Sequence, residues 1–250
     1  MEDSASLIDF YERAYSHRGP EADVYARWRA LGAVGKADHV VELCRRAGLA
    51  PGSTLDVGCG DGALLVELRR RGFGGRLGGV EISEPAAAIA RRAIGDSDIS
   101  LYDGVSLPLE NDSYELGILS HVLEHVQEPS ALLGEVARVC QAVLFEVPLE
   151  ANWSARRPHK RVHANEIGHL QRLDRAGARR IATAAGLTVA AELQDPLPLA
   201  VHRFFATGAA GQTRAGLKWA GRAALDRLAP SLARRAFTLH YACLCRRPGA

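Results

Sequence analysis

The sequence predicts an α/β fold in which a parallel sheet carries helices on both faces. Short runs of apolar and β-branched residues alternate with helical patterns over residues 53–147. A glycine-rich turn, Gly58–Gly62, joins the first of these runs to a helix, as in sites that bind nucleotides. The 250 residues, of which 47% are hydrophobic, suit one such domain with additions.

Helices are expected at the start of the chain. Residues Ile8–His17 and Lys36–Ala47 carry apolar side chains at helical spacing, and Gly48 closes the second helix. Strands and helices then alternate. The expected strands are 53–57, 77–81, 98–102, 115–119 and 142–147, and the expected helices are 62–71, 84–93 and 129–138. Parallel strands joined in this way bind ligands at their carboxyl ends.

The rest of the chain is less regular. Residues 149–173 have little periodicity and are dense in His, Arg, Asn and Trp, which is typical of a functional loop. A helix over 175–185 and a sixth strand over 187–193 follow. Prolines and glycines are expected to keep 195–212 out of regular structure. A helical stretch from about 213 to 237 and a last strand over 238–245 complete the chain.

The composition argues against several classes of function. A formal net charge of +2 leaves no electrostatic footprint of a dedicated nucleic-acid binder. Neither a signal peptide nor a run of ~20 apolar residues is present, so no membrane partner is expected. The five cysteines have no paired spacing, which favours reduced thiols in a cytoplasmic protein. Small molecules are the expected partners, and a homodimer is left open.

The glycine turn carries two acids that decide its ligand. Asp56 and Asp61 would repel a pyrophosphate and attract a cationic ligand. The stretch LDVGCGDG, Leu55–Gly62, resembles motif I of the class I S-adenosylmethionine-dependent methyltransferases. Three further segments agree with that family in order and spacing: the strand that ends in Glu81, the acid Asp103 with its Leu-Pro turn, and the segment Ser120–Val126 after the fourth strand.

The resemblance implies a Rossmann-like, doubly wound seven-stranded sheet whose last strand is antiparallel beside the sixth. An N-terminal helical lid and an inserted loop and helical segment before the last strand complete this expectation. One domain would cover 1–250, with helices and lid at 1–50. The cofactor-binding core would occupy 51–148, and the substrate side 149–250.

S-adenosyl-L-methionine is the cofactor that the resemblance implies, with S-adenosyl-L-homocysteine as product. Glu81 follows the glycine turn by about twenty residues, where an acid accepts both ribose hydroxyls in dinucleotide sites. Asp103 is expected at the adenine amine. The expected cofactor residues are Asp56, Gly58, Gly60, Glu81, Asp103, Gly104, Ser120 and, from the lid, Tyr15, which lies four residues after Tyr11.

Methyl transfer requires nucleophile and methyl donor in near-attack geometry, and a hydroxyl acceptor also needs a base. His121 and His125 are four residues apart and are expected to share a helical face. The resemblance favours His125 as the base, with Glu146 or His169 orienting the imidazole or the acceptor. Two alternatives stay open: His121 packs or caps structurally, and Glu146 pairs with an arginine of the following loop.

The segment from His121 to His125 also matches H-x-x-E-H, a zinc motif of metallopeptidases. The complete methyltransferase pattern explains it without zinc, so no metal ligand is expected. The expected activity is methyl transfer to a hydroxyl of a sugar, glycoside or other secondary metabolite, as in natural product biosynthesis. Alternatives are a small-molecule N- or C-methyltransferase and a non-catalytic protein that binds S-adenosylmethionine. The histidines of the long loop and its basic set are candidates for binding an anionic or polyhydroxylated acceptor: His159, His163, His169, Arg156, Arg157, Lys160 and Arg161.

Overall fold

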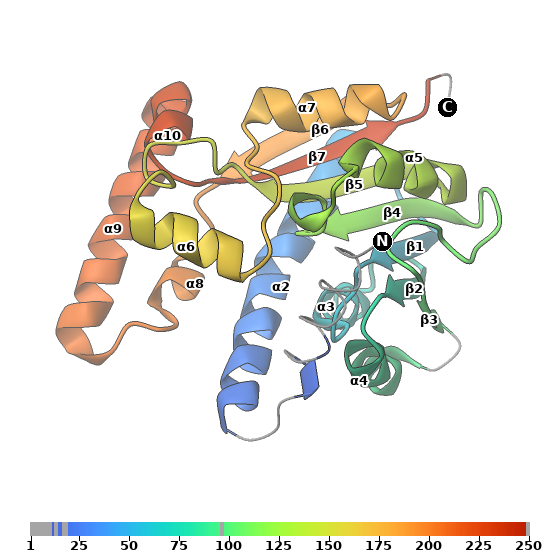
Figure 1. Ribbon diagram of the computed structural model, residues 1–250, viewed down its shortest axis with the longest axis horizontal. Coiled ribbons are helices and arrows are strands. Elements are labelled where there is room, and N and C mark those ends of the chain that lie inside the picture. The colour runs from blue at the N-terminus through green and yellow to red at the C-terminus, as the bar shows by residue number, and fades with distance from the viewer. Residues whose placement is uncertain (1–11, 13–14, 17–19, 96–97, 249–250) are drawn as a thin grey trace.

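One seven-stranded sheet organises the chain. In the computed structural model, which describes residues 12, 15–16, 20–95 and 98–248, the strand order is β3-β2-β1-β4-β5-β7-β6 (Figure 1). The strands are β1 (Ser53–Val57), β2 (Arg76–Glu81), β3 (Ile99–Leu101), β4 (Tyr114–Ser120), β5 (Cys140–Pro148), β6 (Thr188–Asp195) and β7 (His240–Arg246). The first five pair in parallel, and β7 runs antiparallel to both β5 and β6. The predicted topology is confirmed.

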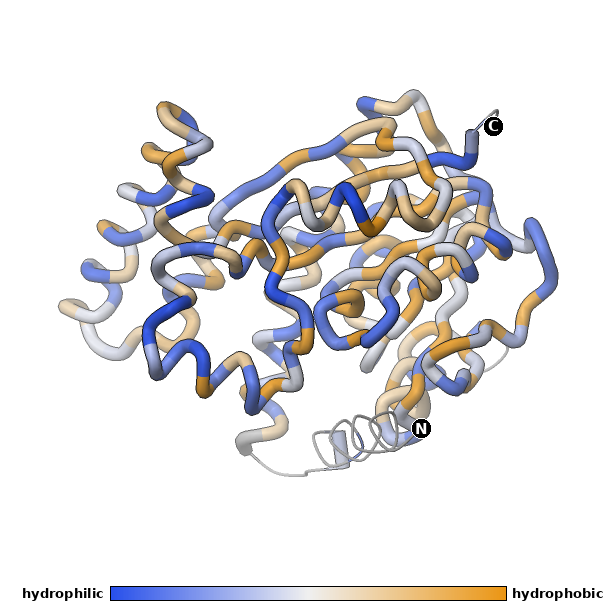
Figure 2. The backbone as a smooth tube through the Cα atoms, turned by 45° about the horizontal axis from the view of Figure 1, so that its top comes forward, coloured by the Kyte–Doolittle hydropathy of each residue, from blue (hydrophilic) through white to orange (hydrophobic). Residues whose placement is uncertain are grey.

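Helices cover both faces of this sheet. The described helices are α2 (Pro20–Arg46), α3 (Ala63–Arg70), α4 (Glu84–Ile94), the 3-10 turn η2 (Leu123–His125), α5 (Pro129–Val139), α6 (Pro158–Glu166), α7 (Arg175–Ala184), α8 (Leu199–Arg203), α9 (Gly208–Leu228) and α10 (Pro230–Ala236). One buried apolar cluster joins the strands to α2, α3 and α4, and another joins them to α5 and α7. Figure 2 shows hydrophobic residues concentrated along the central strands, whereas hydrophobic and hydrophilic residues alternate along α9.

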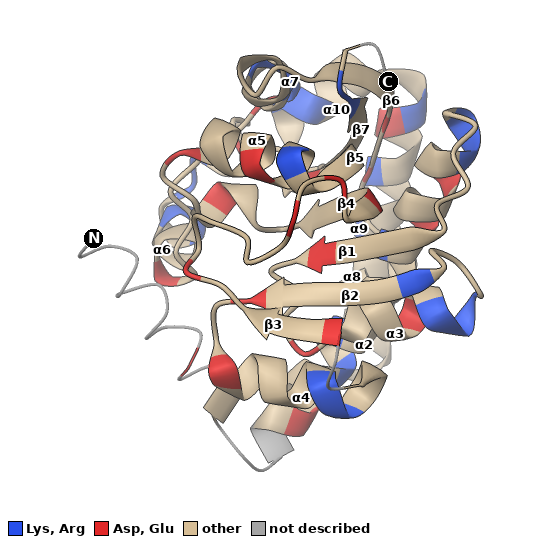
Figure 3. Cartoon of the chain, turned by 90° about the vertical axis from the view of Figure 1, so that its right-hand side faces the viewer, with Lys and Arg blue, Asp and Glu red and all other residues tan. Residues whose placement is uncertain are grey.

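The strand order reverses direction between β1 and β4, where the chain crosses to the other half of the sheet. In doubly wound sheets such a point opens a crevice at the carboxyl ends of the two strands. Figure 3 shows acidic residues at the arrowheads of β1 and β2, beside this point. The fold therefore places the acids Asp56 and Glu81 at the expected ligand crevice.

Three predictions about helices were wrong, and each error has a local reason. Helix α2 extends through Gly32 and Gly35, because its buried face packs on α3 and tertiary packing overrides low helix propensity. Residues 195–212 contain α8 and the start of α9, since Pro198 and Gly208 lie at helix ends, where both residue types are tolerated. The predicted loop 149–173 contains α6.

Two smaller differences concern helix ends. The helical stretch predicted over 213–237 divides at Ala229, because Pro230 cannot continue α9 and instead opens α10. His121 and His125 do not share a helical face. Only the single turn η2 forms there, and His121 precedes it with a φ of 60°. The predicted N-terminal helix at Ile8–His17, including Tyr11, lies largely outside the described residues.

Candidate active site

A cavity of about 840 Å³ opens at the carboxyl ends of β1, β2 and β4. Its walls come from α2, the glycine turn, the end of β2, the segment after β4, the chain after α6 and the start of β7. Seven of the eight predicted cofactor residues line it: Tyr15, Asp56, Gly58, Gly60, Glu81, Gly104 and Ser120. Of the predicted catalytic residues, His125 and His169 line it as well.

The glycine turn presents bare main chain to this cavity. Gly58, Gly60 and Gly62 all have left-handed φ angles, of 72°, 57° and 79°. A Cβ atom at Gly60 would lie 2.7 Å from the Tyr15 hydroxyl, and one at Gly58 would lie 2.8 Å from Val122. Glycine is therefore required both for the backbone angles and for the space beside the turn.

Glu81 links the turn to the end of β2. Its carboxylate accepts hydrogen bonds from the amides of Gly60 (2.8 Å), Ile82 (2.9 Å) and Ser83 (3.0 Å). Burial raises the pKa of Glu81, and these three amides act against that rise. A carboxylate held this rigidly is preorganised to accept further hydrogen bonds, such as those of ribose hydroxyls.

Asp56 gives the cavity its clearest preference for a cation. The side chain is 3% exposed, and burial raises its pKa to about 7. The positive charge of Lys36 acts in the opposite direction, and Glu81 adds to the rise. A bound cation would favour the ionised carboxylate by Coulomb attraction in a medium that screens weakly.

Helix α2 and the lid residue Tyr15 close over the turn. Arg29 on α2 forms an ion pair with Asp61 at 2.6 Å, and its guanidinium carbon lies 4.7 Å from the centroid of the Tyr15 ring. Asp61 therefore binds α2 through Arg29, and its charge is partly compensated before any ligand binds. The contribution of Tyr15 to cofactor binding stays a prediction, and Tyr11 lies outside the described residues.

Asp103 lies at the edge of the cavity, and its predicted contact with the adenine amine stays a prediction. Its carboxylate is exposed, is not part of the cavity lining, and accepts the amides of Val105 (2.8 Å) and Ser106 (2.7 Å). These amide bonds lower its pKa. Tyr102 and Gly104 on either side do line the cavity. Asp103 shapes the loop at the rim, and its neighbours supply the wall there.

His125 and His169 form one pair at the cavity wall. Nδ1 of His125 lies 3.1 Å from the Gly168 carbonyl, which can only accept a hydrogen bond, so the neutral ring carries its proton on Nδ1. Burial is the main cause that lowers the pKa of His125 and favours this neutral form. The His169 ring packs edge-on at a centroid distance of 4.8 Å, and its Nδ1 lies 2.8 Å from Glu150.

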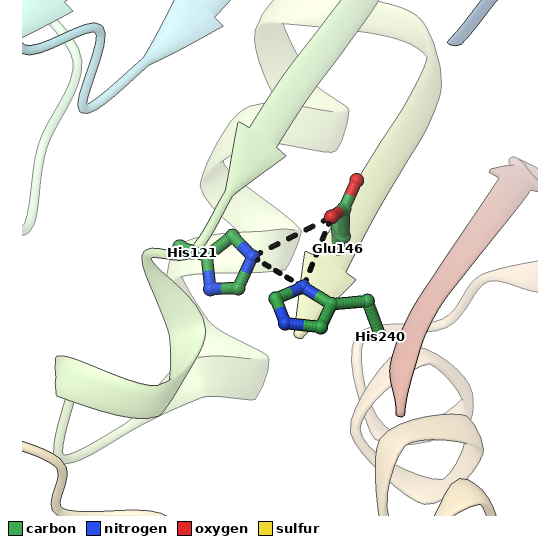
Figure 4. A group of neighbouring side chains, drawn as sticks. All are labelled: His121, Glu146 and His240. Carbon is green, nitrogen blue, oxygen red and sulfur yellow. Dashed lines mark hydrogen bonds and ion pairs between the residues drawn. The ribbon is translucent and has the colours of Figure 1, made fainter. Parts of the chain in front are cut away.

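Glu146 belongs to a different cluster, behind the cavity surface. It is 1% exposed, and its carboxylate binds His39 at 3.0 Å and lies 3.4 Å from both His121 and His240 (Figure 4). The predicted partners of Glu146 were His125 or the acceptor, or else a loop arginine. Its partners here are histidines from α2, from the end of β4 and from β7.

The charges in this cluster compensate one another. Burial would raise the pKa of Glu146, but the three surrounding histidines, His121, His240 and His39, hold that pKa well below its usual value. Burial acts to lower the pKa of His39, yet Asp195 and Glu146 raise it to about 10. His39 is therefore a fixed cation at neutral pH. It connects β5 to the end of β6 through two carboxylates.

A family model described as a methyltransferase domain matches residues 25–192, from α2 into β6. The chain belongs to the class I S-adenosylmethionine-dependent methyltransferases. The glycine turn and Glu81 fall inside the match. S-adenosylmethionine is the methyl donor of this family. Structures of neighbours with the same fold hold it or S-adenosylhomocysteine.

The methyltransferase is also similar to individual proteins. A ubiquinone biosynthesis O-methyltransferase from Hahella chejuensis is 31% identical over 130 residues, 48% of this chain and 54% of that protein. The chain spans 31% to 58% of the length of the curated relatives it matches. Geranyl diphosphate C-methyltransferase from Streptomyces coelicolor has the same fold, with a TM-score of 0.67, 16% identity and 99% of each chain covered. Magnesium protoporphyrin IX methyltransferase from Synechocystis reaches 0.59, with 16% identity over 98% of this chain and 99% of that one.

The outer part of the methyltransferase cavity is aromatic. Tyr25 and Trp28 on α2 each lie 6.3 Å from the Phe205 ring, measured between ring centroids, and all three line the cavity. These rings are 55%, 39% and 57% exposed, unusual for large apolar side chains without a function. Within the described residues, no helix is long and apolar enough to cross a membrane. A ligand with a flat or apolar face fits this mouth.

Sequence reasoning missed His39, His240 and the aromatic mouth of the methyltransferase. His39 is a lone polar residue on the buried face of a predicted helix, and His240 is a lone histidine in a predicted strand. A buried polar residue needs a hydrogen-bond partner, so each histidine indicated a polar contact in the core, although the sequence did not indicate with which residue. Their partners come from strands far away in the sequence, and no spacing rule could identify them.

Proposed function

We propose that this methyltransferase transfers a methyl group to a hydroxyl of a small molecule, such as a sugar, a glycoside or another secondary metabolite. The observation that carries the proposal is the state of His125. Its Nδ1 is used by the Gly168 carbonyl, its pKa is lowered, and it lines the cavity beside the cofactor residues. A neutral imidazole whose lone pair is on Nε2 can accept a proton at neutral pH.

The chemical step then balances as follows. When bound, S-adenosylmethionine supplies an activated methyl group, whose carbon–sulfur bond breaks as the new oxygen–carbon bond forms. His125 Nε2 accepts the proton of the acceptor hydroxyl. Glu150 holds His169, and the His169 ring packs against His125 and fixes the orientation of the base. The remaining acceleration comes from holding the reacting atoms in line.

Two further observations support an oxygen acceptor and a flat or apolar acceptor skeleton. The curated relatives named ubiquinone biosynthesis O-methyltransferases share 31% and 32% identity with 48% and 55% of this chain. The aromatic mouth of Tyr25, Trp28 and Phe205 can stack on a sugar face or an aromatic ring. The basic set of the long loop is absent from the cavity lining, which weakens its role with an anionic acceptor.

The test compares His125→Ala with His159→Ala, because His159 is exposed on α6 and does not line the cavity. An acceptor is first identified by a metabolite screen with labelled methyl donor. We expect kcat of His125→Ala to fall by about two to four decades while the S-adenosylmethionine Kd stays unchanged. Full turnover in His125→Ala would exclude this residue as the base.

A pH profile tests the same step without a mutation. Because the pKa of His125 is lowered, the neutral base is already formed at pH 7. The wild-type rate should therefore stay level around neutrality and decline only when the pH falls below the usual histidine range, ~6.5. If turnover is independent of pH and all cavity histidine variants stay active, an amine or carbon acceptor is the better assignment.

A further inference from the structure

Three side chains from neighbouring strands converge on one point beside the cavity. His121 follows β4, Glu146 is in β5 and His240 begins β7, and strand pairing brings them together, with Ser120 opposite Glu146 and Pro148 opposite His240. His121 Nε2 lies 2.9 Å from His240 Nδ1, and each nitrogen lies 3.4 Å from Glu146 Oε1 (Figure 4). The three donor atoms form a compact triangle.

One of these three atoms, Glu146 Oε1, has no hydrogen bond. Glu146 Oε2 binds His39, but Glu146 Oε1 is fully buried and has no hydrogen-bond partner. A buried carboxylate oxygen without a hydrogen bond is costly, and the two imidazole nitrogens nearest to Oε1 lie 3.4 Å away. Oε1 points to the place between the two imidazole nitrogens, which is where a cation would compensate it.

The two nitrogens facing Oε1 are suited to bind a metal. The Nδ1 atom of His121 lies 2.8 Å from Glu124, so this nitrogen donates and the neutral ring has its lone pair on Nε2. This carboxylate–histidine pair and the His39–Glu146 pair are the kind of contact that orients metal ligands from behind. Asp195 in turn binds His39 at 2.9 Å.

The spacing fits a divalent transition metal. With bonds of about 2.0–2.1 Å in tetrahedral geometry, two donor atoms lie about 3.3 Å apart, close to the observed 2.9 and 3.4 Å. Two imidazoles and one carboxylate are a donor set used by catalytic zinc and by non-haem iron, which leave positions open for water or substrate. His121 and His240 both line the cavity, so the open positions face it.

We propose that His121, Glu146 and His240 bind one divalent transition-metal ion at the acceptor side of the cavity. The site does not depend on the nature of the acceptor. Where the acceptor is a hydroxyl, as in the function proposed above, the ion polarises that oxygen and eases the loss of its proton to His125. The peptidase-like spacing His121-x-x-Glu124-His125 is not this site, because Glu124 orients His121 from behind.

A second group of side chains, called the rival here, could also hold a metal ion: Glu124, His125 and His169. Its Glu124 Oε2 is also buried without a hydrogen-bond partner. The Nδ1 atoms of His125 and His169 are held from behind by Gly168 and Glu150, as that of His121 is by Glu124, so the tautomers do not separate the two groups and the titration of variants must do so. The rival provides the matched control, since His169→Ala removes a histidine at a similar depth in the same cavity.

The experiment titrates chelator-treated full-length protein with Co²⁺, followed by its visible absorption, and with Zn²⁺ by calorimetry. We expect one equivalent per chain. His240→Ala and Glu146→Gln should lower the affinity at least 100-fold, whereas His169→Ala should bind as the wild type does. Circular dichroism checks that each variant is folded, and the Zn²⁺-induced rise in Tm should be lost in the same two variants.

Three results would overturn the site. The wild type could take up no Zn²⁺ or Co²⁺ at millimolar concentration, which would mean that the two histidines share a proton instead. Both folded variants could bind as tightly as the wild type. Binding could also disappear in His169→Ala alone, which would place the ion at the rival group. Because no turnover is measured, an error in the proposed acceptor chemistry leaves this test valid.

Discussion

The cofactor half and the acceptor half of the cavity are held together by different means. In the cofactor half, the turn after β1 and the end of β2 are joined by backbone amides that converge on Glu81. In the acceptor half, β4, β5 and β7 pair through their backbones, and side-chain contacts among histidines and carboxylates link the strand ends that face the cavity. A contact made by backbone amides persists when most of the nearby side chains are substituted. A network of side chains is disrupted when any one of its members is substituted. Variants in the two halves should therefore affect different kinetic constants.

The largest effect we expect in the cofactor half comes from Glu81→Ala. Loss of the contact that we predict between Glu81 and the ribose hydroxyls should cost about 1.5–3 kcal/mol, which corresponds to roughly one to two decades in the S-adenosylmethionine Kd. Calorimetry measures this change, and circular dichroism checks the fold. Glu84→Ala, an exposed neighbour on α4, is the control. An unchanged Kd would mean that Glu81 only holds the glycine turn in place and does not contact the cofactor. It would also contradict the division of roles between the two halves of the cavity.

Asp56→Asn should give a smaller loss, with a characteristic pH dependence. The pKa of Asp56 is raised to about 7, so a cationic ligand should bind the wild type more tightly as the pH rises through that value. We expect about a tenfold change per pH unit at most, because one proton is released. The variant should lack this dependence. An identical pH profile in both proteins would separate Asp56 from the cationic part of the cofactor.

The same substitution should stabilise the ligand-free protein. The folded pKa of Asp56 lies above the unfolded value of ~3.9, so its ionisation opposes folding as the pH rises from about 4 to 7. Asp56→Asn should therefore raise Tm by several degrees at pH 8 and by little near pH 4. Scanning calorimetry at both pH values measures this. An equal shift at both would point to packing instead of charge.

Tyr15→Ala should give the smallest effect. The ring packs against Arg29 and the glycine turn, a contact worth about 0.5–1 kcal/mol, so the S-adenosylmethionine Kd should rise about two- to fivefold. Tyr25→Ala, at the mouth, should instead raise KM for the acceptor and leave the cofactor Kd as it is. If both variants changed the same constant, this result would contradict separate cofactor and acceptor halves of the cavity.

The sequence predicted the parts of this molecule that are coded locally. The strand positions agreed with the structure within two residues, because buried strands need continuous apolar runs. The cofactor turn agreed as well, because only glycine permits its angles. Helix α6 and α8 were missed, since neither has an apolar periodicity of its own and neighbouring elements support them. The contact of Asp103 with the adenine stays a prediction, and two loop amides bind one oxygen of its carboxylate.

The acceptor half could be predicted only in fragments. Glu146 stood out because a carboxylate in an apolar strand needs a partner, yet nothing near it in the sequence named His39 or His240. His121 and His125 were expected on one helical face, but the chain turns through a left-handed residue at His121 and sends the two rings to different clusters. Contacts across β4, β5 and β7 depend on strand register, which short-range patterns do not encode.

Substitutions in the two halves of helix α2 should differ in their effect on stability. Its second half buries Ala37, Val40 and Leu43 against the sheet, whereas its first half exposes Tyr25 and Trp28 at the cavity mouth. Substitution of Tyr25 or Trp28 should therefore alter which molecules enter without disturbing the folded core, whereas Arg29 and Ala33 in the same half contact the cofactor turn and the core. A lineage that carries this helix can acquire new acceptors by single substitutions while it keeps its methyl donor. Directed evolution should begin at those exposed turns.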